Sequence, residues 1–243
     1  MRDGSGRALA ATVLLTILTA CTGAATGGSQ VSTPSATAAD GLDATTSPFA
    51  DTAEPAAVEP GTYRIPSSEW SSADYTVTLP EGWTVQYGHL FLKDSDNPDG
   101  FGFDAVDPDE IYADACEGSN GQLEEVGPGV DDLATALLQQ AGPKARGPIA
   151  TTLGGYPATR IDLAVPDGFD LKTCNVKDVG LQIWYSVPAD KYFVLLPDGI
   201  MSVYIVDVDG QRQTFVTGPR GPATSDEDAR ELQAILDSIR IEP

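Results

Sequence analysis

The stretch SVYIVDVDGQRQTFV, residues 202–216, constrains the fold more than any other part of the chain. Asp209 and Gly210 stand between two runs rich in β-branched and aromatic residues. Such a pair favours the type I′ turn that joins two antiparallel strands. A second reversal is predicted at Gly154-Gly155, within IATTLGGYPATRIDLAV. Two hairpins of this kind predict a sheet that is mainly antiparallel.

Shorter apolar runs predict further strands. ADYTVTLPEGWTVQ gives a strand over Tyr75–Leu79, a turn at Pro-Glu-Gly and a second strand from Trp83. We expect HLFLKD, residues 89–94, to continue that second strand. FGFDAV follows as another strand, with Phe101 and Phe103 on one face. VGLQIWYSV and KYFVLL are strands later in the chain.

Two helices are predicted. The first covers Val130–Gln140, with Asp131 as its cap and Gly142-Pro143 as its stop. The second is C-terminal: Thr224 or Ser225 caps it, and Glu227 or Asp228 completes a capping box. Its apolar positions recur at helical spacing, at Ala229, Leu232, Ile235, Leu236 and Ile239. The pattern predicts a single α+β domain, a mainly antiparallel β-sheet packed by about two helices including the C-terminal one.

The N-terminus has the pattern of an export signal. Two arginines in MRDGSGR precede the 13-residue apolar run ALAATVLLTILTA, which is too short to span a bilayer as a permanent helix. Leu18-Thr19-Ala20-Cys21 resembles a bacterial lipobox, with Thr19 in place of the commoner Ala or Ser. The resemblance implies a lipoprotein signal peptide over 1–20, lipidation of Cys21, and anchoring to the outer face of the cell membrane by acyl chains.

Residues 21–60 separate this signal from the strands. They are rich in Ala, Thr, Ser, Gly and Pro and hold too few large apolar side chains to offset the entropy of ordering. We expect a disordered tether here and an extracytoplasmic domain over 61–243.

Cys116 and Cys174 remain once Cys21 is assigned to lipid. An even pair in an oxidising compartment predicts one disulfide, which would stabilise the domain by about 4 kcal/mol through loop closure. Two buried thiols are the alternative. Metal ligation is weakly supported, because the chain has no CxxC spacing and its one histidine, His89, has no cysteine nearby.

The charge balance excludes several partners. The chain has 36 Asp and Glu against 14 Lys and Arg, a formal net charge of −22. Such a surface repels nucleic acid and anionic lipid headgroups. Solubility is the main interpretation, with cation capture as the alternative. The acidic stretches DSDNPDG and DAVDPDEIYAD do not fit EF-hand spacing, which leaves weak, irregular calcium binding as an open alternative.

Nothing in the sequence assigns a catalytic residue, a cofactor or a metal ligand. The mature chain has no G-x-S-x-G elbow, no P-loop and no dinucleotide fingerprint. We expect His89 to be solvated or packed beside its strand. No pair of carboxylates stands out for glycosidase chemistry. We expect Trp83 and Trp184 in the core, which leaves Trp70 as the aromatic residue best placed for binding.

The segments YTVTLPEGW, TLGGYPATRIDLAV and LQAILDSIRIEP resemble exported actinobacterial lipoproteins of uncharacterised function. The opening strand-turn motif and the terminal helix are also similar to PsbP-like α+β domains. The resemblance implies a fold class and a compartment, and no activity.

We therefore expect a non-catalytic, lipid-anchored extracytoplasmic protein that binds a protein or cell-wall partner. Its ligand and its oligomeric state are not encoded in any recognisable motif. One alternative is a small hydrolase that depends on carboxylates or a cation. Another is a sensory or substrate-capturing lipoprotein, which an apolar pocket of a few hundred Å³ would indicate.

Overall fold

The computed structural model describes residues 48–94, 100–176, 180–186, 191–197, 199–219 and 225–243. The predicted signal peptide and Cys21 lie outside these residues. The described part contains the helices α1 (Val130–Gln139) and α2 (Asp226–Ser238) and the short 3-10 helices η1 (Gly118–Asn120) and η2 (Leu171–Thr173).

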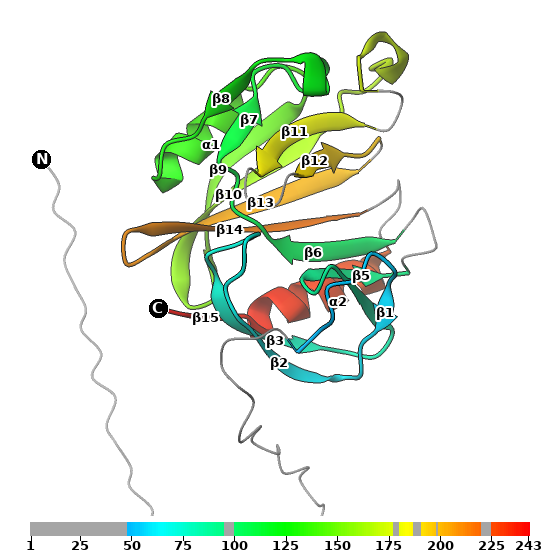
Figure 1. The fold of residues 1–243 in the computed structure, drawn as a ribbon, viewed down its shortest axis with the longest axis vertical. Coiled ribbons are helices and arrows are strands. Elements are labelled where there is room, and N and C mark those ends of the chain that lie inside the picture. Colours follow the sequence, from blue (N-terminus) through cyan, green and yellow to red (C-terminus); the bar gives the residue numbers. More distant parts are fainter. Residues whose placement is uncertain (1–47, 95–99, 177–179, 187–190, 198, 220–224) are drawn as a thin grey trace, which may run out of the picture. The chain divides into compact units, whose positions relative to one another are not determined.

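The strands of the described residues form three antiparallel sheets (Figure 1). The largest has the order β1 (Ala56–Ala57), β4 (Trp83–Gln86), β5 (Leu90–Lys93), β6 (Phe101–Ala105), β14 (Gln211–Pro219), β13 (Ile200–Val208), β10 (Tyr156–Ala164) and β9 (Lys144–Leu153). The second has the order β12 (Lys191–Leu195), β11 (Leu181–Ser186), β7 (Glu110–Tyr112) and β8 (Leu123–Glu125). The third consists of β15 (Arg240–Glu242), β3 (Asp74–Leu79) and β2 (Gly61–Ile65).

The largest sheet separates two hydrophobic cores, and β13 shows this most clearly. Tyr204, Val206 and Val208 belong to the first core, whereas Met201, Val203 and Ile205 belong to the second. Alternate residues of a strand point to opposite faces. The nearly unbroken apolar run of β13 is therefore explained by burial on both faces of the sheet.

The first core lies between the largest sheet, the three-stranded sheet and α2. Its members include Tyr75 and Val77 of β3, Ile235 and Leu236 of α2, and Ile241 of β15. The Trp83 indole N–H donates to Glu231 of α2 at 2.8 Å, and Lys93 pairs with the same carboxylate at 2.7 Å. Both contacts tie the C-terminal helix to the β4–β5 hairpin.

The second core lies between the same sheet, the four-stranded sheet and α1. It buries Leu133 and Leu137 of α1 together with Ile111, Ile183 and Trp184 of the smaller sheet. α1 packs against β9, β10 and β13. The two faces of the largest sheet are thus covered by different partners.

The predicted α+β class with a mainly antiparallel sheet and two helices is confirmed, as is the disulfide between Cys116 and Cys174. Asp209-Gly210 reverses the chain between β13 and β14 with φ of 53° and 85°, as a type I′ turn requires. The capping box of α2 is formed by Ser225 and Asp228.

Two predictions of detail are wrong. HLFLKD does not continue the preceding strand, because Tyr87 and Gly88 have φ of 53° and 73° and turn the chain back, so that β5 pairs with β4. The cap of α1 is Gly129 and not Asp131, which lies in the first turn. The Gly129 N–H donates to Asp132 at 2.9 Å.

Packing begins before residue 61. The ring of Phe49 lies 4.9 Å from that of Tyr63 and 5.5 Å from that of Phe91, centroid to centroid. β1 pairs with β4, and Val58 is buried in the first core. These contacts extend the packed region into the last part of the stretch expected to be a tether.

Candidate functional site

A cavity of about 570 Å³ opens on the second face of the largest sheet. Its walls come from β5, β6, β13 and β14 of that sheet and from β12 of the four-stranded sheet. Most of the lining side chains are aliphatic or aromatic, among them Leu92, Phe193, Val194, Met201 and Val216. A mainly apolar concavity of this size is typical of a site for a small molecule.

Two glycines lie opposite each other in the cavity wall. In the ladder that joins β5, β6 and β14, Leu92 is opposite Gly102, and Gly102 is opposite Gly218. Alternation places Gly218 on the same face as Val216, which belongs to the second core. Neither glycine projects a side chain from this face. A Cβ at residue 102 would lie 2.4 Å from the carbonyl oxygen of Phe91 and 2.8 Å from Cδ2 of Leu92, so Gly102 allows β5 and β6 to pack closely in the cavity wall.

A buried His–Asp pair stands in this apolar wall. Nδ1 of His89 lies 2.7 Å from Oδ1 of Asp104, and the two side chains are 9% and 3% exposed. A carboxylate only accepts, so Nδ1 carries the proton of this hydrogen bond. The second nitrogen of the ring, Nε2, and the second oxygen, Oδ2, have no hydrogen-bond partner among the described residues.

Charge on Asp104 governs the protonation of His89. Burial lowers the pKa of the imidazole, but the charge of Asp104 and the hydrogen bond to it raise the pKa, assisted by Asp51 and Glu69. The net effect is a pKa above the ordinary value of 6.5. The pair therefore favours an imidazolium beside a carboxylate. Burial, followed by the charge of Asp104, also raises the pKa of Tyr75.

Two aromatic rings cover His89. The ring of Trp70 lies 4.4 Å from the imidazole at an angle of 35°, and the ring of Tyr87 lies 6.4 Å from it. A cation within about 6 Å of an indole face is attracted by the ring quadrupole. Trp70 thus stabilises the charged form of His89 and forms part of the cavity wall.

The turn that carries His89 is strained. Tyr87 and Gly88 occupy the two central positions of a type I′ turn, which the His89 N–H closes by donating to the carbonyl of Gln86 at 3.2 Å. The first of these positions suits Asn, Asp or Gly, and a bulky residue with positive φ is an outlier. An aromatic residue is thus held at the cavity in spite of its backbone preference.

Asp107 holds the loop that carries Trp70. Its Oδ2 accepts from both the N–H and the hydroxyl of Ser72 at 2.7 Å, and its Oδ1 accepts from the N–H of Thr214 at 3.0 Å. The Asp107 N–H donates to the Trp70 carbonyl at 2.8 Å. Burial raises the pKa of Asp107 against these hydrogen bonds and the charge of Arg212. The carboxylate positions one wall of the cavity.

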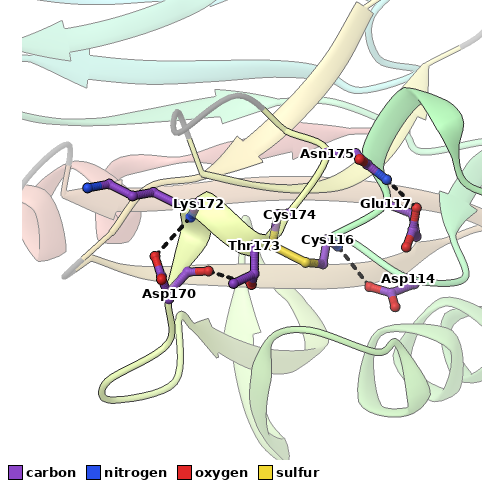
Figure 2. Close-up of a disulfide and its surroundings, with 8 residues drawn as sticks. All are labelled: Asp114, Cys116, Glu117, Asp170, Lys172, Thr173, Cys174 and Asn175. Carbon is purple, nitrogen blue, oxygen red and sulfur yellow. Dashed lines mark hydrogen bonds between the residues drawn. A yellow bond between two sulfur atoms is a disulfide. The ribbon is translucent and has the colours of Figure 1, made fainter.

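The disulfide between Cys116 and Cys174, shown in Figure 2, packs against the second core. It joins the segment before η1 to the segment after η2, with the two Cα atoms 4.8 Å apart. Asn175 donates its backbone N–H to the carbonyl of Cys116 at 2.9 Å and its side-chain amide to Glu117 at 2.5 Å. The bridge fixes two loops beside the four-stranded sheet, whose strand β12 forms a wall of the cavity.

His89 is packed, which is one of the two environments that the sequence predicts, and its buried contact with Asp104 at a cavity goes beyond that prediction. The available signal was Asp104, an acid within an otherwise apolar strand, because a buried carboxylate needs a partner. Which partner it takes depends on the β4–β5 turn, which the sequence pattern did not identify.

The three tryptophans of the sequence lie in two different environments. Trp83 and Trp184 are buried, as expected, and Trp70 is half-buried at the cavity rather than exposed.

Residues 95–99 of the first acidic stretch lie outside the described residues. In the described part of the chain, no three His, Cys, Asp or Glu side chains gather in a way that could hold a metal ion. Of the described residues that line the cavity, Asp104 is the only carboxylate.

Comparisons with known proteins assign no family. No family model matches the chain, and no curated protein does. A solved structure of LpqN, described as involved in cell envelope biogenesis of Mycobacterium tuberculosis, is similar over 75% of this chain and 91% of its own. The identity is 13% and the TM-score 0.35, too low to transfer a function.

In the described residues, no helix has the length and apolar character needed to cross a bilayer.

Proposed function

We propose that this protein is a lipid-anchored extracytoplasmic binding protein that holds a small, mainly apolar molecule in the cavity beside His89. The cavity carries the proposal. Its volume of about 570 Å³ falls within the range of roughly 300–1,000 Å³ of sites for small ligands. Its walls are apolar except for a few polar groups. In sites for small molecules, apolar walls bury the ligand and a few polar groups fix its orientation.

The entrance supports the same function. Tyr87 and Tyr192 both line the cavity, and their exposed fractions are 37% and 53%. Exposed apolar groups gathered at one opening mark a place where an apolar ligand enters or a partner docks.

A second candidate, hydrolysis of a captured ester, draws on the His89–Asp104 pair. In that reaction Nε2 would remove a proton from water while Asp104 stabilised the resulting imidazolium. Such a base must be neutral at the working pH. The raised pKa of His89 works against this requirement, so binding is the better supported function.

The test compares two matched variants. Leu196 lines the cavity and Ile200 does not. Both are aliphatic residues with some solvent exposure, and they lie four positions apart between the end of β12 and the start of β13. Leu196→Trp should lower the affinity for the neutral probe N-phenyl-1-naphthylamine at least tenfold by filling the cavity, whereas Ile200→Trp should leave it within about twofold. The full chain carrying Cys21→Ser is used, since it lacks acyl chains that could occupy the site. Equal probe affinity in the two variants would contradict the proposal.

The anchor has its own test. Cys21→Ser should release the protein from the membrane fraction into the medium, because the thiol is the acceptor of the lipid. Cys116→Ser should leave the protein in the membrane fraction. Retention of the Cys21→Ser protein there would exclude the lipobox assignment.

A further inference from the structure

His89, which lines the cavity, has one buried polar atom without a partner in the described part of the chain. Nδ1 is engaged by Asp104, which leaves Nε2 as the position from which the imidazolium can donate. Both residues line the cavity, and His89 is only 7% exposed. A buried donor without a partner is unfavourable by itself, so the site gains when a ligand supplies an acceptor. The wall thus contains a built polar anchor in apolar surroundings.

The charges around the anchor decide which acceptor fits. The imidazolium of His89 is already balanced by Asp104, and the further charges that act on it, Asp51 and Glu69, are acidic. None of the described lining residues is Lys or Arg. A carboxylate or phosphate head group would meet three carboxylates and one cation. An ammonium head group has no lone pair, so it could not accept a hydrogen bond from Nε2 and would face the imidazolium at that position.

We propose that the cavity selects an uncharged amphiphile, with an alkyl or aromatic body and an ester, amide or ketone carbonyl that accepts a hydrogen bond from Nε2 of His89. This inference rests on the proposed function and adds the ligand class to it. The body lies against Leu92, Val194 and Met201. The carbonyl lies at the end of the cavity where Trp70 and Tyr87 cover the imidazole.

Access to Nε2 requires a side-chain movement. The atom is buried, with the ring of Trp70 4.4 Å from the imidazole, so a carbonyl reaches it only when Trp70 or Tyr87 shifts. Trp70 is half-buried on the loop between β2 and β3, and Tyr87 is exposed at its turn. A ligand that binds in this way should change the tryptophan emission of the protein, because the indole moves relative to the cationic ring.

The experiment uses four probes with the same eight-carbon chain. Methyl octanoate, octanoate, octylammonium and 1-chlorooctane displace N-phenyl-1-naphthylamine from the Cys21→Ser chain, and each dissociation constant is measured. A hydrogen bond from a charged donor predicts roughly tenfold tighter binding of methyl octanoate than of 1-chlorooctane. Octanoate and octylammonium should bind more weakly than the ester.

The double variant His89→Phe/Asp104→Leu removes the anchor without leaving either partner buried alone, a replacement that folded proteins often tolerate. It should bind 1-chlorooctane as the parent chain does and show no preference for the ester. An unchanged preference, or tighter binding of octanoate or octylammonium than of the ester by the parent chain, overturns the inference. If neither N-phenyl-1-naphthylamine nor any of the four chains binds, the proposed function itself fails.

Discussion

The two faces of the largest sheet are built differently although they share the same strands. On the first face, aromatic rings pack against one another: Trp83 lies 5.4 Å from Phe101, and Phe91 stacks on Phe103 at 4.8 Å. On the second face, mostly aliphatic side chains, a disulfide and a cavity take their place. The first face is packed throughout its aromatic core, while the second combines a packed core with a cavity.

Adjacent residues of β14 make the comparison testable. Phe215 is fully buried in the first core, and Val216 lies on the cavity side. Phe215→Ala should reduce the free energy of unfolding by about 3–5 kcal/mol, the usual cost of deleting a buried aromatic ring. Val216→Ala should cost clearly less and enlarge the cavity instead. Urea denaturation measures both, and equal losses would show that the two faces are packed alike.

Removal of the disulfide should weaken the second face selectively. The double variant Cys116→Ala/Cys174→Ala opens the loop between two cysteines that are 58 positions apart in the sequence. The free energy of unfolding should fall by about 2–4 kcal/mol. Hydrogen exchange should accelerate more in β7 and β11 than in β3, because the bridge holds loops beside the four-stranded sheet. Uniform acceleration across the domain would mean that the faces do not respond separately.

The pH dependence of stability tests the buried pair. The folded-state pKa of His89 is above its ordinary value of 6.5. Its contribution to stability is therefore fully present below about pH 6.5 and is lost as the pH rises through the folded-state pKa. Denaturation midpoints of the parent chain should fall over this window, and the double variant His89→Phe/Asp104→Leu should lack that component. Asp51 and Glu69 also raise the pKa of His89, so their removal should lower that pKa and narrow the pH range over which stability is lost.

The smallest expected effect concerns the strained turn. Tyr87→Asn places a residue that tolerates positive φ at the first central position of the type I′ turn. Stability should rise by about 0.5–1 kcal/mol through relief of strain. Probe affinity should fall, because an aromatic wall residue is lost. A thermal melt and a probe titration separate the two consequences, and a loss of stability would argue against strain at this position.

The parts of the fold that the sequence predicts are those fixed by neighbouring residues. Asp209-Gly210 and the Ser225–Asp228 capping box act within a few residues, and both formed as expected. The β4–β5 reversal was missed because a tyrosine at that position carries no turn signal. Local chemistry is sufficient only where local preference and tertiary structure agree.

The candidate site depends on registry between strands, which local patterns do not determine. His89 and Asp104 meet because β4, β5 and β6 pair with particular registers, and Gly102 faces Gly218 for the same reason. Taken alone in the sequence, His89 and Asp104 are polar residues in or near a strand, and the two glycines are weak strand formers. Only the assembled sheet shows that they border one cavity.

The Cys116–Cys174 bridge has a consequence for resistance to proteolysis. The covalent ring that it closes contains β8 of the four-stranded sheet, α1, and the strands β9 and β10 of the largest sheet. A protease that cuts any connection within this ring leaves both fragments joined through sulfur. The two fragments would separate only when the disulfide is reduced. Until then they would stay together and could repack into the native structure.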